Sequence, residues 1–113
     1  MTFKPIIDRV QVICTNNVSQ DVVLNKLVPG ETYTWHEITG INRTAGTTTI
    51  EIGLKHGTEF FAYRCATAAV LDRSVRLQTH IIAPGEFVPC ARFKVAGLLS
   101  LLELVVNGHA GHI

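Results

Sequence analysis

The stretch that decides the fold is Val28-Pro29-Gly30-Glu31-Thr32, together with its echo at residues 83–87, Ala-Pro-Gly-Glu-Phe. Each phrase follows an apolar run and opens a new alternating stretch. Proline fixes φ near the value needed at the first corner of a type II turn, and glycine supplies the positive φ at the second corner. Two such turns between short alternating stretches predict an antiparallel β-sandwich. The echo is either a pseudo-repeat of two Greek keys or the chance recurrence of a common turn phrase.

Alternation of apolar and polar residues predicts about eight strands. The clearest is residues 47–55, in which Ile50, Ile52 and Leu54 fall on one parity. An apolar face with period two is the mark of a half-buried strand. We therefore expect an all-β fold, an antiparallel, jelly-roll-like β-sandwich with at most one short helical turn. The other seven expected strands are residues 6–14, 22–28, 32–41, 58–65, 74–82, 87–95 and 98–106.

The sequence departs from simple strand alternation at three places. Ile38 falls on the parity opposite to Trp35, which predicts a bulge near His36-Glu37. The alanine-rich residues 66–72 fit one helical turn or a loop. The leucine-rich residues 98–106 fit a strand or a helix of about two turns, and the glycines on both sides favour the strand.

Composition limits the partners of the chain. With 113 residues it is expected to form a single β-sandwich domain, residues 1–113, with an N-terminal arm at 1–5 and a C-terminal tail at 107–113. A net charge of +1 offers no basic face for nucleic acid. The apolar run 95–106 contains Ser100 and Glu103 and is too short to span a membrane. Mean hydropathy of +0.27 with 17% charged residues predicts apolar surface, and hence a subunit of an assembly.

The cysteines point to the compartment in which the chain folds. Cys14, Cys65 and Cys90 are an odd number at wide spacing, which is not typical of a disulfide framework. The first residues do not resemble a signal peptide. We expect free thiols in a chain that is made in a reducing cytoplasm.

Histidines are the only candidates for a reactive site, because the sequence contains none of the common catalytic or nucleotide-binding motifs. His36, His56 and His80 fall in separate strands or turns and lack the close His-x-His pattern of a cupin-type enzyme. His109 and His112 have a spacing that suits a metal only on a helix, and a third ligand would be missing. We expect no catalytic residue, no cofactor and no metal.

His36 also stands next to Glu37, in the order of a base and its partner. Neighbours along a strand point to opposite faces, so this pairing is not expected.

The sequence allows two roles for the aromatic residues. They fill the core of the sandwich, or they form an exposed platform for sugar or for a partner chain. We expect Tyr33 and Trp35 to share one face, and we expect any aromatic residue left outside to act as an interface anchor. The candidate interface residues are Phe3, Tyr33, Trp35, Phe61, Tyr63 and Phe87.

Four phrases, taken in order, resemble small virion proteins of tailed bacteriophages. They are residues 28–32 (VPGET), 38–44 (ITGINRT), 47–53 (TTTIEIG) and 82–86 (IAPGE), and the likeness covers about residues 22 to 108. Members of this group are β-sandwich or jelly-roll proteins that decorate or cement capsids, or that form parts of the head–tail and fibre apparatus. The chain differs from fibre shafts in having no long stalk or collagen-like repeat.

The resemblance implies a function. It implies a non-enzymatic structural protein of the virion, a capsid decoration or cement protein that bridges capsid subunits. The expected partners are the major capsid protein or neighbouring virion proteins and further copies in a homodimer or homotrimer. The alternative is a head–tail or tail-fibre component with a carbohydrate- or receptor-binding sandwich module.

Overall fold

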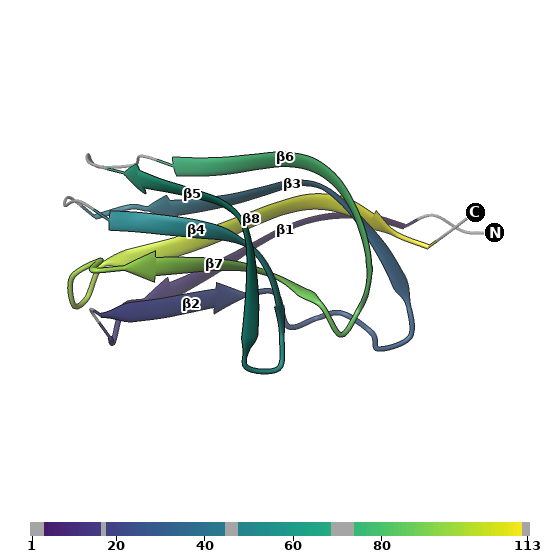
Figure 1. Ribbon diagram of the computed structural model, residues 1–113, viewed down its shortest axis with the longest axis horizontal. Coiled ribbons are helices and arrows are strands. Elements are labelled where there is room, and N and C mark those ends of the chain that lie inside the picture. Colours follow the sequence, from purple (N-terminus) through teal and green to yellow (C-terminus); the bar gives the residue numbers. More distant parts are fainter. Residues whose placement is uncertain (1–3, 17, 45–47, 69–73, 112–113) are drawn as a thin grey trace.

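The computed structural model describes residues 4–16, 18–44, 48–68 and 74–111 of the chain. These residues form eight strands in two antiparallel four-stranded sheets (Figure 1), which confirms the predicted all-β sandwich. No helix occurs in these ranges. The strands are β1 (Lys4–Ile13), β2 (Ser19–Val23), β3 (Thr32–Asn42), β4 (Thr48–His56), β5 (Glu59–Ala68), β6 (Ser74–Pro84), β7 (Val88–Lys94) and β8 (Leu101–Ala110).

The topology is that of a long hairpin folded over on itself. Four antiparallel pairs are nested, β4 with β5, β3 with β6, β2 with β7 and β1 with β8. Two further pairings, β3 with β8 and β4 with β7, complete the sheet orders β1-β8-β3-β6 and β2-β7-β4-β5. This nested, rolled arrangement is a jelly roll, as expected from the sequence. The innermost hairpin turns through Gly57-Thr58, where Gly57 has a φ of +60°.

The first Pro-Gly phrase forms the predicted turn. The amide of Glu31 donates to the carbonyl of Val28 at 3.2 Å, which closes a four-residue turn with Pro29 and Gly30 at its corners. Gly30 has a φ of +87°, as the second corner of a type II turn requires.

The second Pro-Gly phrase turns differently. The amide of Phe87 donates to the carbonyl of Pro84 at 3.0 Å, so that Pro84 opens the turn instead of occupying its first corner. Gly85 does not have a positive φ, and the prediction of a second type II turn is wrong. Glycine is needed here for space, because a Cβ atom would meet the backbone of Val28 and lie 3.1 Å from a ring carbon of Tyr33.

The two Pro-Gly phrases contact each other. The amide of Gly30 donates to a carboxylate oxygen of Glu86 at 2.8 Å, and the amide of Gly85 donates to the carbonyl of Glu31 at 3.0 Å. These bonds hold the β2–β3 connection against the β6–β7 connection at one end of the sandwich.

A bulge interrupts β3 where the sequence predicts one. The register of β3 shifts between Trp35 and Glu37 against both of its neighbours. Trp35 and Ile38 are both buried, so His36 and Glu37 lie side by side on the outer face of the sheet. The expectation that His36 and Glu37 point to opposite faces is therefore wrong, and the bulge is the reason.

The two sheets approach each other closely at Gly40 of β3. A Cβ atom there would lie 2.8 Å from Ile50 Cγ2 and 2.9 Å from Ile52 Cδ1, both on β4 of the opposite sheet. Ile50 and Ile52 are fully buried, as their parity predicts. Around them the core is filled by large side chains, of which Trp35 and Phe93 are the largest.

The ends of the described chain are more ordered than expected. Lys4 pairs with Ala110 and Pro5 with His109, so residues 4–5 and 107–110, expected in an arm and a tail, are paired strand. The leucine-rich segment is a strand from Leu101, not a helix.

Two boundaries also differ from the sequence-based expectation. Strand β5 continues through Ala68, so no helical turn forms at 66–68, and the rest of that expected turn lies outside the described residues. Strand β2 ends at Val23, and residues 24–28 form an irregular connection.

Replacing Trp35 tests the core. Its side chain has no exposed surface and stacks on Tyr33 with ring centroids 5.8 Å apart. We expect Trp35→Ala to lower the free energy of unfolding by about 3–5 kcal/mol, because it leaves a cavity. Denaturant unfolding measures this loss. Ile82→Ala, at a side chain that is 62% exposed, is the control and should change stability by less than about 0.5 kcal/mol. An equally small effect at Trp35 would contradict its central place in the core.

Candidate functional site

The most exposed element of the sandwich is the edge strand β5. It pairs with β4 only, so among the described residues the backbone groups on its other side are not paired with another strand. Native edge strands are usually short or are protected by lysine or proline. Strand β5 is ten residues long and contains neither, although it carries the charged Arg64 and a bulge at Tyr63, where its register against β4 shifts. Its exposed side chains are Glu59, Phe61, Ala62, Tyr63, Arg64, Cys65 and Thr67.

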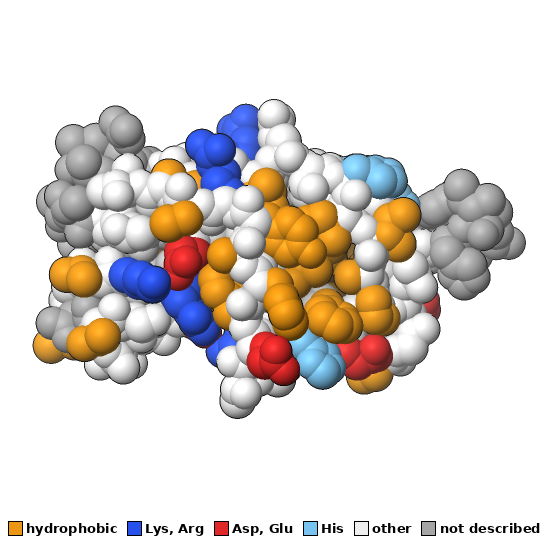
Figure 2. All heavy atoms as spheres, viewed as in Figure 1, with side chains coloured by type: hydrophobic (Ala, Val, Ile, Leu, Met, Phe, Trp, Pro, Cys, Tyr) orange, Lys and Arg blue, Asp and Glu red, His pale blue; other side chains and the backbone are white. Residues whose placement is uncertain are grey.

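Aromatic rings cluster beside this edge. Phe61 of β5 lies 6.2 Å from Phe87, centroid to centroid, and Phe87 stacks on His56 at 4.7 Å. We call Phe61, Phe87 and His56 the aromatic patch. Phe61 and Tyr63 are 43% and 54% exposed. Figure 2 shows hydrophobic side chains gathered on this face beside the β4–β5 hairpin, with a histidine at their border.

The structure separates the candidate interface residues into two groups. Phe61 and Tyr63 are exposed on β5, whereas Phe87 is half-buried, packed against the core and in contact with Phe61. Tyr33 and Trp35 are buried in the core, with 4% and 0% exposure, and offer no surface to a partner. Phe3 lies outside the described residues.

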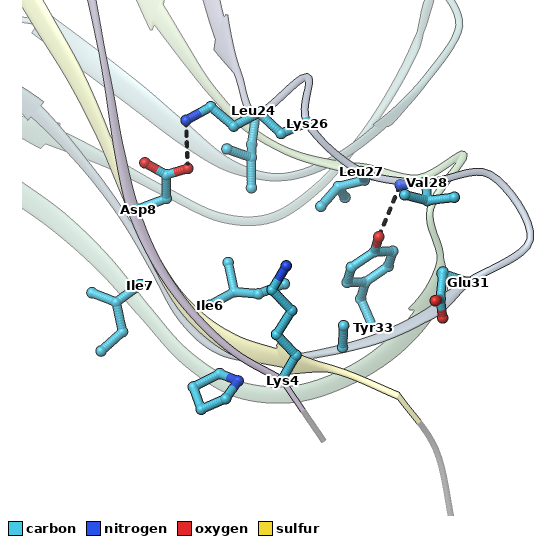
Figure 3. Close-up of a pocket in the computed structure, with 12 residues that line it drawn as sticks. Lys4, Ile6, Ile7, Asp8, Leu24, Lys26, Leu27, Val28, Glu31 and Tyr33 are labelled. Atoms are coloured by element: carbon cyan, nitrogen blue, oxygen red, sulfur yellow. Dashed lines mark hydrogen bonds and ion pairs between the residues drawn. The ribbon is translucent and has the colours of Figure 1, made fainter. Parts of the chain in front are cut away.

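A pocket of about 350 Å³ opens between β1 and the β2–β3 connection (Figure 3). Its walls are apolar, and its rim carries Lys4, Asp8, Lys26 and Glu31. The ammonium of Lys26 pairs with the carboxylate of Asp8 at 3.0 Å. The other lining residues are Pro5, Ile6, Ile7, Leu24, Leu27, Val28, Tyr33 and Ala110.

Tyr33 also lines this pocket, and its hydroxyl group is engaged in a hydrogen bond. The hydroxyl oxygen accepts a hydrogen bond from the amide of Val28 at 2.8 Å. A hydrogen bond from the amide of Arg9, together with the contact to Lys26, lowers the pKa of Asp8. The rim is therefore charged and the interior apolar, an arrangement that suits an amphipathic group.

An ion cluster covers the outer face of the β2-β7-β4-β5 sheet. Asp21 accepts two hydrogen bonds from Arg92, at 2.8 and 3.0 Å, and one from Lys55 at 2.7 Å. The guanidinium of Arg92 also lies 4.6 Å from the ring centre of Phe60. Burial alone would raise the pKa of Asp21, but the hydrogen bonds from Arg92 and Lys55 outweigh it, and the pKa is lowered. Burial, together with the charge of Asp21, raises the pKa of the Cys90 thiol to about 12.

Asp21 gives a pH-dependent prediction. Because its pKa is lowered on folding, its charged form stabilises the fold above its unfolded pKa near 3.8, and this contribution is lost as the pH falls through the folded value. We expect Asp21→Asn to lower the free energy of unfolding by about 1–3 kcal/mol at neutral pH. The difference from the unmodified chain should shrink at about pH 3.

Urea unfolding at the two pH values measures this effect. Glu59→Gln, at an exposed carboxylate, is the matched control and should show little difference at either pH. An Asp21→Asn effect of equal size at both pH values would contradict the role of charge.

Three histidines meet on the outer face of the other sheet. His36, on the bulge of β3, lies between His109 of β8 and His80 of β6, and these are neighbouring strands. The ring centroid of His36 is 5.2 Å from that of His109 and 5.6 Å from that of His80. The Nε2 atom of His36 is 3.1 Å from the Nδ1 atom of His109. We call these three residues the histidine cluster.

Sequence reasoning missed this cluster. It placed the histidines in separate strands and compared them only with an enclosed cupin-type site. The missing information was the strand order β8-β3-β6, which brings together residues far apart in the chain. His56 lies elsewhere, in the aromatic patch. As the side chains stand, no group of three or more His, Cys, Asp or Glu in the described ranges is arranged to hold a metal ion.

Comparison with protein-family models and with curated proteins finds no match for this chain. The described residues also contain no helix that is long and apolar enough to cross a membrane.

Proposed function

We propose that this chain is a non-enzymatic structural protein of a tailed-bacteriophage virion, a capsid decoration or cement protein that bridges subunits of the shell. In this proposal it is made in the bacterial cytoplasm and acts as a homodimer or homotrimer on the major capsid protein. The observation that carries the proposal is the long, exposed edge strand β5 with the aromatic patch beside it.

The edge of β5 supports binding to another chain in a specific way. An exposed edge strand with apolar side chains is a template for strand addition, in which backbone hydrogen bonds supply affinity and side chains supply specificity. Phe61 and Tyr63 project from this strand and are well exposed. Exposed aromatic side chains are also the residues most often found as anchors at the centre of interfaces.

A rigid sandwich suits a cement function for a thermodynamic reason. A protein that binds only the assembled shell stabilises that shell by mass action. Many copies on one closed particle add avidity, so that each contact need not be strong. The filled core around Trp35 and Phe93 means that little binding energy is lost to rearrangement of the subunit.

The fold and the resemblance add support at the level of analogy. The sheet orders β1-β8-β3-β6 and β2-β7-β4-β5 define a jelly roll, a fold shared by viral capsid proteins, lectins and cupins. Fold alone does not select among these functions. The turn and strand phrases of residues 28–53 and 82–86 favour the virion class.

The pocket beside β1 favours a second candidate, the head–tail or tail-fibre component with a receptor-binding module. Its apolar interior and its rim of Lys4, Asp8, Lys26 and Glu31 could receive a small amphipathic or sugar-like group. This candidate predicts binding of a glycan without binding of the shell.

Lysines placed on β5 test the edge contact. We expect the purified chain to be a dimer or trimer, and Ala62→Lys with Tyr63→Lys to make it monomeric, because lysine on an edge opposes strand pairing. Light scattering with size-exclusion chromatography measures the mass. Ile7→Lys, on the edge strand β1 at a side chain that is 77% exposed, is the matched control and should leave the mass unchanged. A chain that is monomeric at all concentrations would overturn the contact.

Shell binding tests the cement function itself. We expect the chain to co-sediment with shells assembled from the major capsid protein of the same virus, and to raise the temperature at which those shells come apart. Cryo-electron microscopy of the native particle should then show it in many symmetric copies. An oligomer that forms through β5 but neither binds nor stabilises shells would overturn the cement function and leave the edge contact intact.

A further inference from the structure

We propose that the histidine cluster, His36, His80 and His109, is a surface binding site for a divalent transition-metal ion of the zinc, nickel or copper type. This site goes beyond the proposed virion function, since it lies on the outer face of the β1-β8-β3-β6 sheet, whereas the aromatic patch belongs to the β5 edge of the other sheet.

The spacing of the rings fits one shared ion. Two imidazoles on a tetrahedral ion, with metal–nitrogen bonds of about 2.05 Å, place their bonded nitrogens about 3.3 Å apart and their ring centroids about 5.2 Å apart. His36 Nε2 and His109 Nδ1 are 3.1 Å apart, and the centroids of the same two rings are 5.2 Å apart. The centroid of His80 is 5.6 Å from that of His36.

The fold supplies the reason for this convergence. His36 occupies the bulge of β3, and a bulge redirects a side chain. Its strand lies between β8 and β6, which carry the two other histidines. Backbone pairing to both neighbours therefore fixes the three Cα positions before any ion binds, which lowers the ordering cost of binding.

For the three histidines to bind one ion, the side chain of His80 must move. The nitrogens of His36 and His109 already face each other, whereas the described residues contain no complete three-ligand arrangement. His80 is exposed, so its ring can change rotamer at small cost. The carboxylate of Glu37, adjacent to His36, is directed to Arg76 at 3.7 Å and is not counted among the ligands.

Imidazole selects the class of ion. It binds Zn²⁺, Ni²⁺ and Cu²⁺ well, whereas Ca²⁺ and Mg²⁺ require oxygen ligands. Three imidazoles leave the remaining coordination positions open to water or to a group from a neighbouring molecule. The alternative is a hydrogen bond between His36 and His109 with no affinity for an ion.

Calorimetric titration of the full chain, without a histidine tag, with Zn²⁺ alone and with Ni²⁺ alone tests the site. We expect one ion per chain, and we expect His36→Ala, His80→Ala and His109→Ala each to weaken binding by about tenfold or more. His56→Ala is the matched control, since His56 is an exposed histidine outside the cluster, and it should bind as the unmodified chain does. Mg²⁺ should give no binding.

His112→Ala separates the cluster from a pair formed by His109 and His112. We expect this variant to bind normally. Binding that survives His36→Ala and His80→Ala but is lost in His112→Ala would overturn the proposal, as would the absence of binding by the unmodified chain.

A measurement on the unmodified chain tests the site without depending on whether the variants fold. Bound Ni²⁺ is paramagnetic and broadens the nuclear magnetic resonance signals of nearby residues. We expect the broadening to centre on His36, His80 and His109. Broadening centred on any other residues would overturn the site.

Discussion

The close approach of the two sheets at Gly40 is the constraint on which the rest of the structure depends. Because this residue has no Cβ atom, Ile50 and Ile52 of the opposite sheet can lie directly against the β3 backbone. The contact sets the distance between the sheets near the centre of the sandwich, and side chains such as Trp35 and Phe93 fill the space around it. The centre of the sandwich is therefore filled by packed apolar side chains. The groups that could take part in recognition lie on the outer faces, at the edges and around the pocket.

The two proposed interactions use different outer surfaces. The β5 edge offers backbone groups and aromatic side chains to another chain, and the outer face of the β1-β8-β3-β6 sheet offers imidazoles to an ion. The ion cluster around Asp21 lies on the outer face of the β5-containing sheet, where it connects β2, β7 and β4 through Arg92 and Lys55. We regard it as a structural support for that sheet.

Local patterns in the sequence predicted most of the fold. The parity of Ile50 and Ile52, and the break in parity before Ile38, gave a core strand and a bulge that the structure confirms. The errors fall where a distant contact decides the conformation. Gly85 resembles a turn glycine but is required by the nearby backbone of the other Pro-Gly phrase. Gly108 resembles part of a loose tail but lies in β8, where a larger residue would collide with the backbone of β3. The histidine cluster was not predictable for the same reason, since it depends on strand order.

The nested pairing also decides where the chain can be cut and joined. Strand β1 begins and strand β8 ends at the same end of the sandwich (Figure 1). Lys4 and Ala110 are partners there, so their Cα atoms lie about 5 Å apart. A short linker could connect them, while new ends could open in the two-residue loop at Gly57-Thr58. Such a circular permutant would keep all six strand pairings and would turn the innermost hairpin of the roll into its outermost pair.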